Sequence, residues 1–378
     1  MKLITVLGAT EPKHKQHYVH EGKIYDDYFA FLALARALSI PPASIIVIGT
    51  EKTRGLLNTE LYAIASEIRD NFVLSTDSVD ELFEKCLSLI DDDTVLDVTQ
   101  GFRHMPMTLL LSGIAASSQK RLSGIYYART ANSDCNPSFA SCTFEFISLS
   151  SYLDRANLNA IVDSFCASYV VPRLRITLRD YAPVEAKLSE LSRHLLGNNS
   201  DQAIVCARKL LAHLETLHAS SISESIRELE AEVRKIVSLS EHSESLRLYG
   251  AAKLYFEKDL LLHAVTNLFE AVLAYLDEYV TAQNIPMQYY DFKRRHPHRC
   301  SEEKKPYNRR NCLKKGLNEF VKKHPFHPVL NKALQSKLET IDRLRNHSAH
   351  AHATEKSDRH YKDRLGESFV FFDRIITG

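Results

Sequence analysis

The spacing of hydrophobic residues changes at about residue 150. Before that point, short apolar runs typical of buried parallel strands alternate with segments that have apolar residues at helical spacing. The runs are Leu3–Leu7, Ile45–Ile48, Phe72–Leu74, Thr94–Val98, Ile125–Tyr127 and Thr143–Ile147. The helical segments are Tyr28–Leu38, Ser78–Ile90 (with Ser78 as the expected N-cap) and Met105–Ser117. Repeated strand–helix units predict a three-layer, doubly wound α/β domain over residues 1–150.

Beyond about Asp154 the pattern is helical almost throughout. The predicted helices are Ser223–Leu239, Ser245–Val280 with a break near Lys258–Asp259, and Val329–Ala349 as the last long helix. Residues 286–328, with five prolines and many charges, are predicted to be a loop or insertion between helices. The predicted fold class is therefore α/β followed by all-α, with a helical connector over 151–240 and a separate helical domain over 241–378.

The composition is that of a folded globular chain and sets bounds on its location. The 378 residues are 44% hydrophobic and 25% charged with a net charge of +1, which suits two or three domains. No apolar run approaches the ~18 residues that span a membrane, and Leu3–Leu7 is too short for a signal peptide. Seven scattered cysteines without a CxxC pair favour reduced thiols in the cytosol.

One histidine- and cysteine-containing stretch suggests a metal site at first sight. It contains His296, His298 and Cys300, with Cys312 further along. Their spacing matches no common structural zinc site. We therefore expect no metal.

Three polar loops follow predicted strands at the sheet edge where open α/β folds bind ligands. They are Gly8–Thr10, Gly49–Thr53 and Asp97–Pro106. Glycines let a phosphate approach the backbone, hydroxyl groups donate to it, and an arginine binds it bidentately. The candidate ligand-binding residues are Gly8, Thr10, Thr50, Thr99, Gln100, Gly101, Phe102 and Arg103. Because neither GxGxxG nor GxxxxGK[ST] occurs, a dinucleotide or nucleoside-triphosphate site is disfavoured. The alternative is that these residues only shape turns.

The run Asp97-Val-Thr-Gln-Gly-Phe-Arg-His-Met-Pro106 resembles the DxTxGFRxxP signature of the CARF domain in type III CRISPR-associated proteins. The resemblance covers about residues 1–150. It implies a Rossmann-like homodimer that binds a cyclic oligoadenylate across its twofold axis. A ligand on that axis meets identical residues from both subunits, so tetra- and hexa-adenylate rings fit whereas odd-numbered rings do not.

A second concentration of functional side chains lies in Ile341–His352, which contains two arginines, one asparagine and three histidines. Histidine moves protons at neutral pH, and arginine stabilises charge on a phosphate. This set suits attack of an RNA 2′-hydroxyl on the adjacent phosphate without a metal. The alternative is a polar helix end whose cations favour the helix dipole.

Arg345-Asn346-x3-His350 resembles the R-x4–6-H motif of HEPN ribonucleases, and the preceding helices resemble that family's bundle. The resemblance assigns Arg345 and His350 to catalysis and Asn346 to an orienting role. It implies metal-independent endonucleolytic cleavage of single-stranded RNA to 2′,3′-cyclic phosphates, in a prokaryotic cytoplasm. His352 and His347 are alternative catalytic histidines. On an ideal helix Arg345 and His350 point about 140° apart, so the helix must end or bend there, or two subunits must share one site.

Residues 293–323 contain twelve Lys or Arg and three acids, a local excess of nine positive charges. Such a segment attracts phosphates and predicts RNA binding, although a solvated loop has the same composition. Two other functions stay open. One is a sensor that also degrades its cyclic oligoadenylate, and the other is a non-catalytic nucleic-acid-binding regulator.

Overall fold

The computed structural model describes residues 1–8, 14–57, 68, 71–117, 119–120, 122–131, 141–174, 176, 181–217, 224–285, 306–349 and 355–376. The chain divides into two compact units. Unit 1 comprises Met1–Ile161 and Pro172–Ala182, and unit 2 comprises Val162–Val171 and Pro183–Gly378. In the part of the chain that the structure describes, every helix is too short or too polar to span a lipid bilayer.

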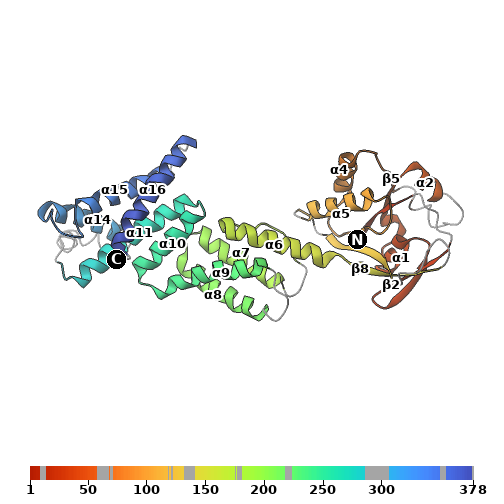
Figure 1. The fold of residues 1–378 in the computed structure, drawn as a ribbon, viewed down its shortest axis with the longest axis horizontal. Coiled ribbons are helices and arrows are strands. Elements are labelled where there is room, and N and C mark those ends of the chain that lie inside the picture. Colours follow the sequence, from red (N-terminus) through yellow and green to blue (C-terminus); the bar gives the residue numbers. More distant parts are fainter. Residues whose placement is uncertain are drawn as a thin grey trace. The chain divides into compact units, whose positions relative to one another are not determined.

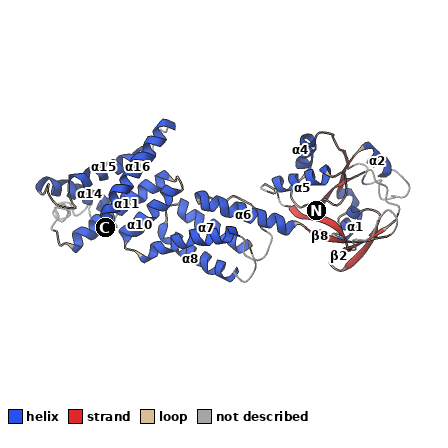
Figure 2. Ribbon diagram, in the orientation of Figure 1, coloured by secondary structure: helices blue, strands red, loops and turns tan. Residues whose placement is uncertain are grey.

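Unit 1 is built around a β-sheet with helices packed beside it (Figures 1 and 2). The sheet has eight strands in the order β3-β2-β8-β7-β6-β1-β4-β5. The strands are β1 Lys2–Leu7, β2 Gln16–His20, β3 Lys23–Asp27, β4 Ile45–Gly49, β5 Phe72–Leu74, β6 Thr94–Asp97, β7 Leu122–Thr130 and β8 Thr143–Ser148. Strands β5, β4, β1, β6 and β7 pair in parallel, as predicted, whereas β8 pairs antiparallel with β7. The predicted strands are therefore confirmed, within a mixed sheet.

Helices cover both faces of this sheet. They are α1 Ala30–Ala37, α2 Glu51–Leu57, α4 Val79–Leu89, α5 His104–Ala116 and the first part of α6 Ser150–Ser168, with a 3₁₀ turn at Pro42–Ser44. Alternate residues of β1 enter different cores: Leu3 packs with α1, and Ile4 packs with α4 and α5. This alternation produces the predicted three layers. The predicted cap is also confirmed, because the Ser78 hydroxyl accepts the Glu81 N–H at 3.3 Å.

Two features of unit 1 differ from expectation. The β2–β3 hairpin was missed because its strands are mostly polar; its signal is the turn at Glu21 and Gly22, where φ is 48° and 77°. The expectation of reduced cysteines is wrong for Cys142, which forms a disulfide. Cys86, Cys166 and Cys206 are free.

Unit 2 is entirely helical in its described part. Its helices are the end of α6, then α7 Ala182–Leu196, α8 Ser200–Leu217, α9 Glu224–Ser238, the 3₁₀ turn Leu239–Glu241, α10 Glu244–Glu257, α11 Leu261–Ala282, α14 Pro306–Lys323, α15 Lys332–Ala349 and α16 Glu355–Ile376. The predicted break is confirmed between α10 and α11, where Asp259 has φ of 58°. The fold class is thus α/β followed by all-α. The finer division into connector and last domain stays a prediction.

Two predictions about unit 2 are wrong. The expected loop over 286–328 contains helix α14, which buries Leu313, Leu317 and Phe320 at helical spacing despite its high charge. Val329–Ala349 is not the last long helix, because α16 follows it. Helix α16 begins with a strongly charged stretch, but its buried apolar residues recur every three or four positions. These are Tyr361, Leu365, Phe369, Phe372 and Ile376.

The chain crosses between the units three times. The first crossing falls inside α6, between Ile161 and Val162. The second precedes Pro172 and the third precedes Pro183. Within unit 2, the short segment between the first two crossings is anchored by Tyr169, which is fully buried and donates its hydroxyl to Glu232 at 2.9 Å.

Candidate functional site

In unit 1, two glycines bring the loops after β1 and β6 together. A Cβ atom on Gly8 would lie 3.5 Å from the backbone of Gly101. Gly101 has φ of +116°, where side chains are strained, and a Cβ there would lie 3.2 Å from Val6. Both positions therefore favour glycine because of the geometry of the loops. The structure thus brings Gly8 and Gly101 to one place, at the carboxyl ends of adjacent strands.

Asp97 and Thr99 hold the β6 loop in place. Asp97 is fully buried and accepts hydrogen bonds from Thr5 Oγ1 at 2.9 Å and from Thr99 N and Oγ1 at 3.1 and 2.5 Å. Burial raises the pKa of Asp97 above its usual range, although these hydrogen bonds oppose the shift. Thr99 Oγ1 also accepts the Ala128 N–H at 2.9 Å, which ties the loop to β7. The Thr99 hydroxyl is therefore engaged inside the protein, and its contact with a ligand stays a prediction.

Thr50 has a similar local role after β4. Thr50 and Thr53 bond reciprocally, each backbone N–H donating to the other's hydroxyl at 3.3 Å, at the start of α2. Buried Thr53 also donates to the Leu7 carbonyl at 3.3 Å, so this turn is attached to the end of β1. The sequence did not single out Thr53. Its signal was the T-x-x-T spacing after a strand.

Three exposed side chains lie at the end of this loop and the start of α5, namely Phe102, Arg103 and His104. The Phe102 and His104 rings stack, with centroids 6.4 Å apart and planes 5° apart. Gln100 Oε1 is buried without a hydrogen-bond partner among the described residues. The Arg103 guanidinium has no partner among the described residues, and together with the exposed rings and the start of α5 it suits a ligand with phosphates and bases. Thr10 lies outside the described residues.

We expect Thr99→Val to destabilise unit 1 by about 1–3 kcal/mol, because it leaves the Ala128 N–H and part of the buried Asp97 carboxyl without partners. Faster hydrogen exchange at the Ala128 amide in the full chain would report the loss. Thr108→Val is the control, since Thr108 is buried and, among the described residues, its hydroxyl bonds only within its own helix, at the His104 carbonyl. Equal exchange at Ala128 in the two variants would contradict the assigned role of Thr99.

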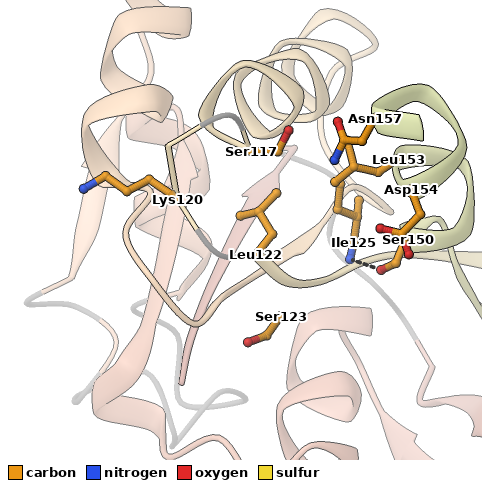
Figure 3. Close-up of a pocket in the computed structure, with 9 residues that line it drawn as sticks. All are labelled: Ser117, Lys120, Leu122, Ser123, Ile125, Ser150, Leu153, Asp154 and Asn157. Carbon is orange, nitrogen blue, oxygen red and sulfur yellow. Dashed lines mark hydrogen bonds between the residues drawn. The ribbon is translucent and has the colours of Figure 1, made fainter. Parts of the chain in front are cut away.

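A separate pocket of unit 1 lies at the opposite ends of the strands. Figure 3 shows its lining from the end of α5, the start of β7 and the first turns of α6, where the Ser150 hydroxyl accepts the Ile125 N–H at 3.3 Å. Asp154 and Asn157 line it and are buried. Because Leu122 begins β7, this pocket lies at the amino ends of the parallel strands. It is therefore distinct from the candidate ligand site.

In unit 2, Arg345 is held in one orientation by two neighbours. Its Nη2 donates to Asp342 Oδ1 at 2.8 Å, and its guanidinium lies 4.1 Å from the centroid of the Phe269 ring. The Arg345 side chain is still 26% exposed. A guanidinium has five N–H donors in a rigid plane, so the remaining donors can bind a phosphate. Arg345 is thus oriented by protein contacts and open on one side.

The other residues of the motif are placed only in part. Asn346 and His347 are exposed near the end of α15. His350 and His352 lie outside the described residues. The choice among His350, His352 and His347 as the catalytic histidine therefore stays a prediction, as does the orienting role of Asn346.

Asp342 links Arg345 to the basic helix α14. Its second carboxylate oxygen accepts Lys314 Nζ at 2.5 Å, and the side chains of Lys314 and Asp342 are 25% and 18% exposed. The sequence analysis did not single out Asp342, although it stands three residues before Arg345, on the same helix face. The predicted basic segment outside 306–323 lies beyond the described residues.

Three residues elsewhere in unit 2 have the geometry to hold a metal ion. Ligand atoms of Glu190, His194 and Cys206 lie within 4.8 Å of one another on α7 and α8. Burial, and then the neighbouring Glu190 carboxylate, raise the pKa of the Cys206 thiol above its usual value. A metal would have to displace that proton, which weakens binding. The earlier candidates His296, His298 and Cys300, and the side chain of Cys312, lie outside the described residues.

Comparison with known proteins gives matches among solved structures alone. No family model and no curated protein matches the sequence. Among solved structures, the chain is similar to Enterococcus italicus Csm6 bound to cyclic hexa-2′-fluoro-hexa-dAMP. The TM-score is 0.44 at 14% sequence identity, and the match covers 98% of this chain and 93% of that chain.

Proposed function

We propose that the chain is a CARF–HEPN ribonuclease of type III CRISPR antiviral defence. Unit 1 of a homodimer binds cyclic tetra- or hexa-adenylate, and unit 2 is thereby activated to cut single-stranded RNA without a metal. Arg345, Asn346 and His350 carry out the cleavage. Gly8, Thr10, Thr50, Thr99, Gln100, Gly101, Phe102 and Arg103 form the activator site.

The observation that carries the nuclease assignment is the placement of Arg345. Stacking on Phe269 and pairing with Asp342 restrict its rotamers, so little entropy is lost when its free N–H groups meet a phosphate. A fixed cation there stabilises charge on the phosphorane formed by 2′-hydroxyl attack. A histidine of the motif supplies and removes protons. The leaving 5′-oxygen takes a proton, and the product is a 2′,3′-cyclic phosphate.

The activator assignment depends on the exposed end of the β6 loop. Arg103 is exposed and suits a phosphate, and the stacked Phe102 and His104 rings offer a surface for adenine. The buried Asp97–Thr99 network makes this loop rigid, which favours binding without ordering cost.

A direct test incubates the purified full chain with labelled single-stranded RNA and each cyclic oligoadenylate in turn, in EDTA. We expect cleavage with one even-numbered ring and ends that carry 2′,3′-cyclic phosphate. Cleavage that requires an added divalent metal would overturn the proposed mechanism. No cleavage with any ring, or equal cleavage without one, would overturn the gated ribonuclease.

The basic segment gives a further prediction. Arg309→Glu with Arg310→Glu is expected to weaken RNA affinity and flatten its salt dependence, with little change in the saturated rate, because these residues gather substrate rather than catalyse. Affinity is measured by fluorescence anisotropy across a salt series. Lys23→Glu with Lys120→Glu makes the same charge change at exposed sites of unit 1. Equal effects of the two pairs would leave only a general charge effect.

A further inference from the structure

A second cluster of cationic side chains lies between α15 and α16, on a face of α15 different from that of Arg345. It lines a pocket that is open to solvent. The lining residues are Arg343, Leu344, His347, His360, Tyr361 and Arg364. Leu344 and Tyr361 are buried and form an apolar base, whereas both histidines are exposed. The pocket thus combines an apolar base with a cationic rim.

The charges of this pocket are unbalanced. None of its six lining residues is acidic. Some other arginines in the described part pair with acids, such as Arg36 with Asp27 and Arg234 with Glu230. In contrast, among the described residues Arg343 donates only to a carbonyl of its own helix, from Nε to Glu339 O at 3.3 Å. Two guanidinium groups in one pocket repel each other unless an anion neutralises them.

Three of the four cationic or basic lining side chains have free hydrogen-bonding capacity. The side chains of Arg364, His347 and His360 make no hydrogen bond or ion pair with any residue that the structure describes. They come from two helices and converge on one space, as the ligands of a tetrahedral oxyanion do. The planar guanidinium suits two phosphate oxygens at once, and an imidazole N–H donates to a third.

The position of this pocket relative to Arg345 follows from helix geometry. Arg343 and His347 are one turn apart and lie on the same face of α15. Along the helix axis Arg345 lies midway between Arg343 and His347, but it is rotated about 200° around that axis from each of them. A helix with its side chains is about 10–12 Å across. Arg345 and the pocket therefore face opposite sides of one helix, a few nucleotides apart for a strand that bends around it.

We propose that this pocket binds a backbone phosphate of the RNA substrate, a few nucleotides away from the phosphate that meets Arg345. The inference rests on the proposed function and adds a second phosphate subsite to it. Only a flexible strand can present nearby phosphates to opposite faces of one helix. The pocket therefore selects single-stranded RNA over a duplex, whose backbone follows a fixed helical path.

The test measures RNA binding separately from cleavage. The probe is a fluorescein-labelled single-stranded RNA with 2′-O-methyl groups, which cannot undergo 2′-hydroxyl attack, and anisotropy is read across a salt series. For Arg343→Gln with Arg364→Gln in the full chain, we expect affinity at least about tenfold lower. The slope of log affinity against log salt should shrink by about 0.7, the value for one lost phosphate on a single strand.

The matched control removes two arginines from exposed positions of unit 2 outside the pocket, by Arg227→Gln with Arg374→Gln. We expect a much smaller loss. Arg364→Lys serves if the double variant fails to fold, because it keeps the charge but loses the bidentate fork, and it should show a smaller but clear loss. With cleavable RNA, the pocket variant should raise KM and leave kcat within about threefold. A dinucleotide, which has only the scissile phosphate, should be cut equally by both proteins.

The outcomes separate the two proposals. If RNA cleavage is absent or independent of Arg345, the proposed function fails. If cleavage depends on Arg345 but the pocket variant binds RNA as tightly as the control pair, the second phosphate subsite alone is wrong. Equal losses in both pairs would likewise overturn the subsite, because only total charge would then matter.

Discussion

Arg345→Ala is expected to lower activated RNA cleavage at least about 100-fold while the chain stays folded. The lost group is the cation that stabilises charge on the attacked phosphate, and effects of this kind commonly reach that size. Arg345→Lys should recover little, because lysine keeps the charge but neither the planar fork nor the stacking on Phe269. The measurement is the initial rate of single-stranded RNA cleavage at saturating activator, with circular dichroism to confirm folding.

Arg374→Ala is the control, since Arg374 is exposed on α16 and its substitution removes the same charge. It should leave the rate unchanged. Single alanine substitutions at His350, His352 and His347 then identify the catalytic histidine. We expect His350→Ala to match Arg345→Ala. Loss of activity only at His352 would lengthen the gap between Arg345 and the catalytic histidine by two residues. Full activity of Arg345→Ala would exclude a HEPN-type mechanism for this chain.

Arg103→Ala is expected to abolish activation at low activator and to restore part of it at high activator. Arg103 is exposed beside the Gly8–Gly101 contact and is proposed to bind an activator phosphate. A ligand shifts a two-state equilibrium only through its different affinities for the two states. An activator that binds more weakly therefore needs a higher concentration to populate the active state to the same extent. Its maximum effect falls if the lost contact favours the active state.

Activation curves of RNA cleavage against cyclic oligoadenylate test this expectation. The rate without activator should equal that of the unsubstituted chain. Lys23→Ala, an exposed charge of unit 1 on β3, is the control and should leave the curve unchanged. An Arg103→Ala curve identical to that of the unsubstituted chain would remove Arg103 from the activator site.

The sequence predicted the elements of unit 1 well because buried parallel strands read as continuous apolar runs. Ile45–Ile48 is such a run, and a buried parallel strand is its simplest explanation in a globular chain of this composition. The polar hairpin formed by β2 and β3 has no such run, so it was missed. Helices α14 and α16 of unit 2 were missed because their sequences contain many charged residues. Helix α14 buries a narrow stripe beneath many lysines and arginines, and the stripe becomes clear only when its packing is known.

The candidate sites were predictable as motifs but not as contacts. Residue types and spacing pointed to Arg345, yet Phe269 is distant in sequence and no local pattern connects it with the motif. The same holds for the pocket between α15 and α16, which needs two helices to form. At the β6 loop, the sequence marked Thr99 as a ligand residue, while the structure engages its hydroxyl with Asp97 and Ala128. A residue that belongs to a ligand-binding motif can therefore stabilise the loop that carries the motif.

The three chain crossings have a practical consequence for truncated fragments. A fragment that ends at residue 150 loses the part of α6 that belongs to unit 1, and Leu153, which packs against its core, goes with it. A fragment that ends at residue 182 keeps that part but also carries Phe165 and Tyr169, whose buried surfaces belong to unit 2. Each single cut therefore exposes apolar surface and favours aggregation. Isolated halves of this chain are poor substitutes for the whole in biochemical assays, and the intact protein is the proper material for them.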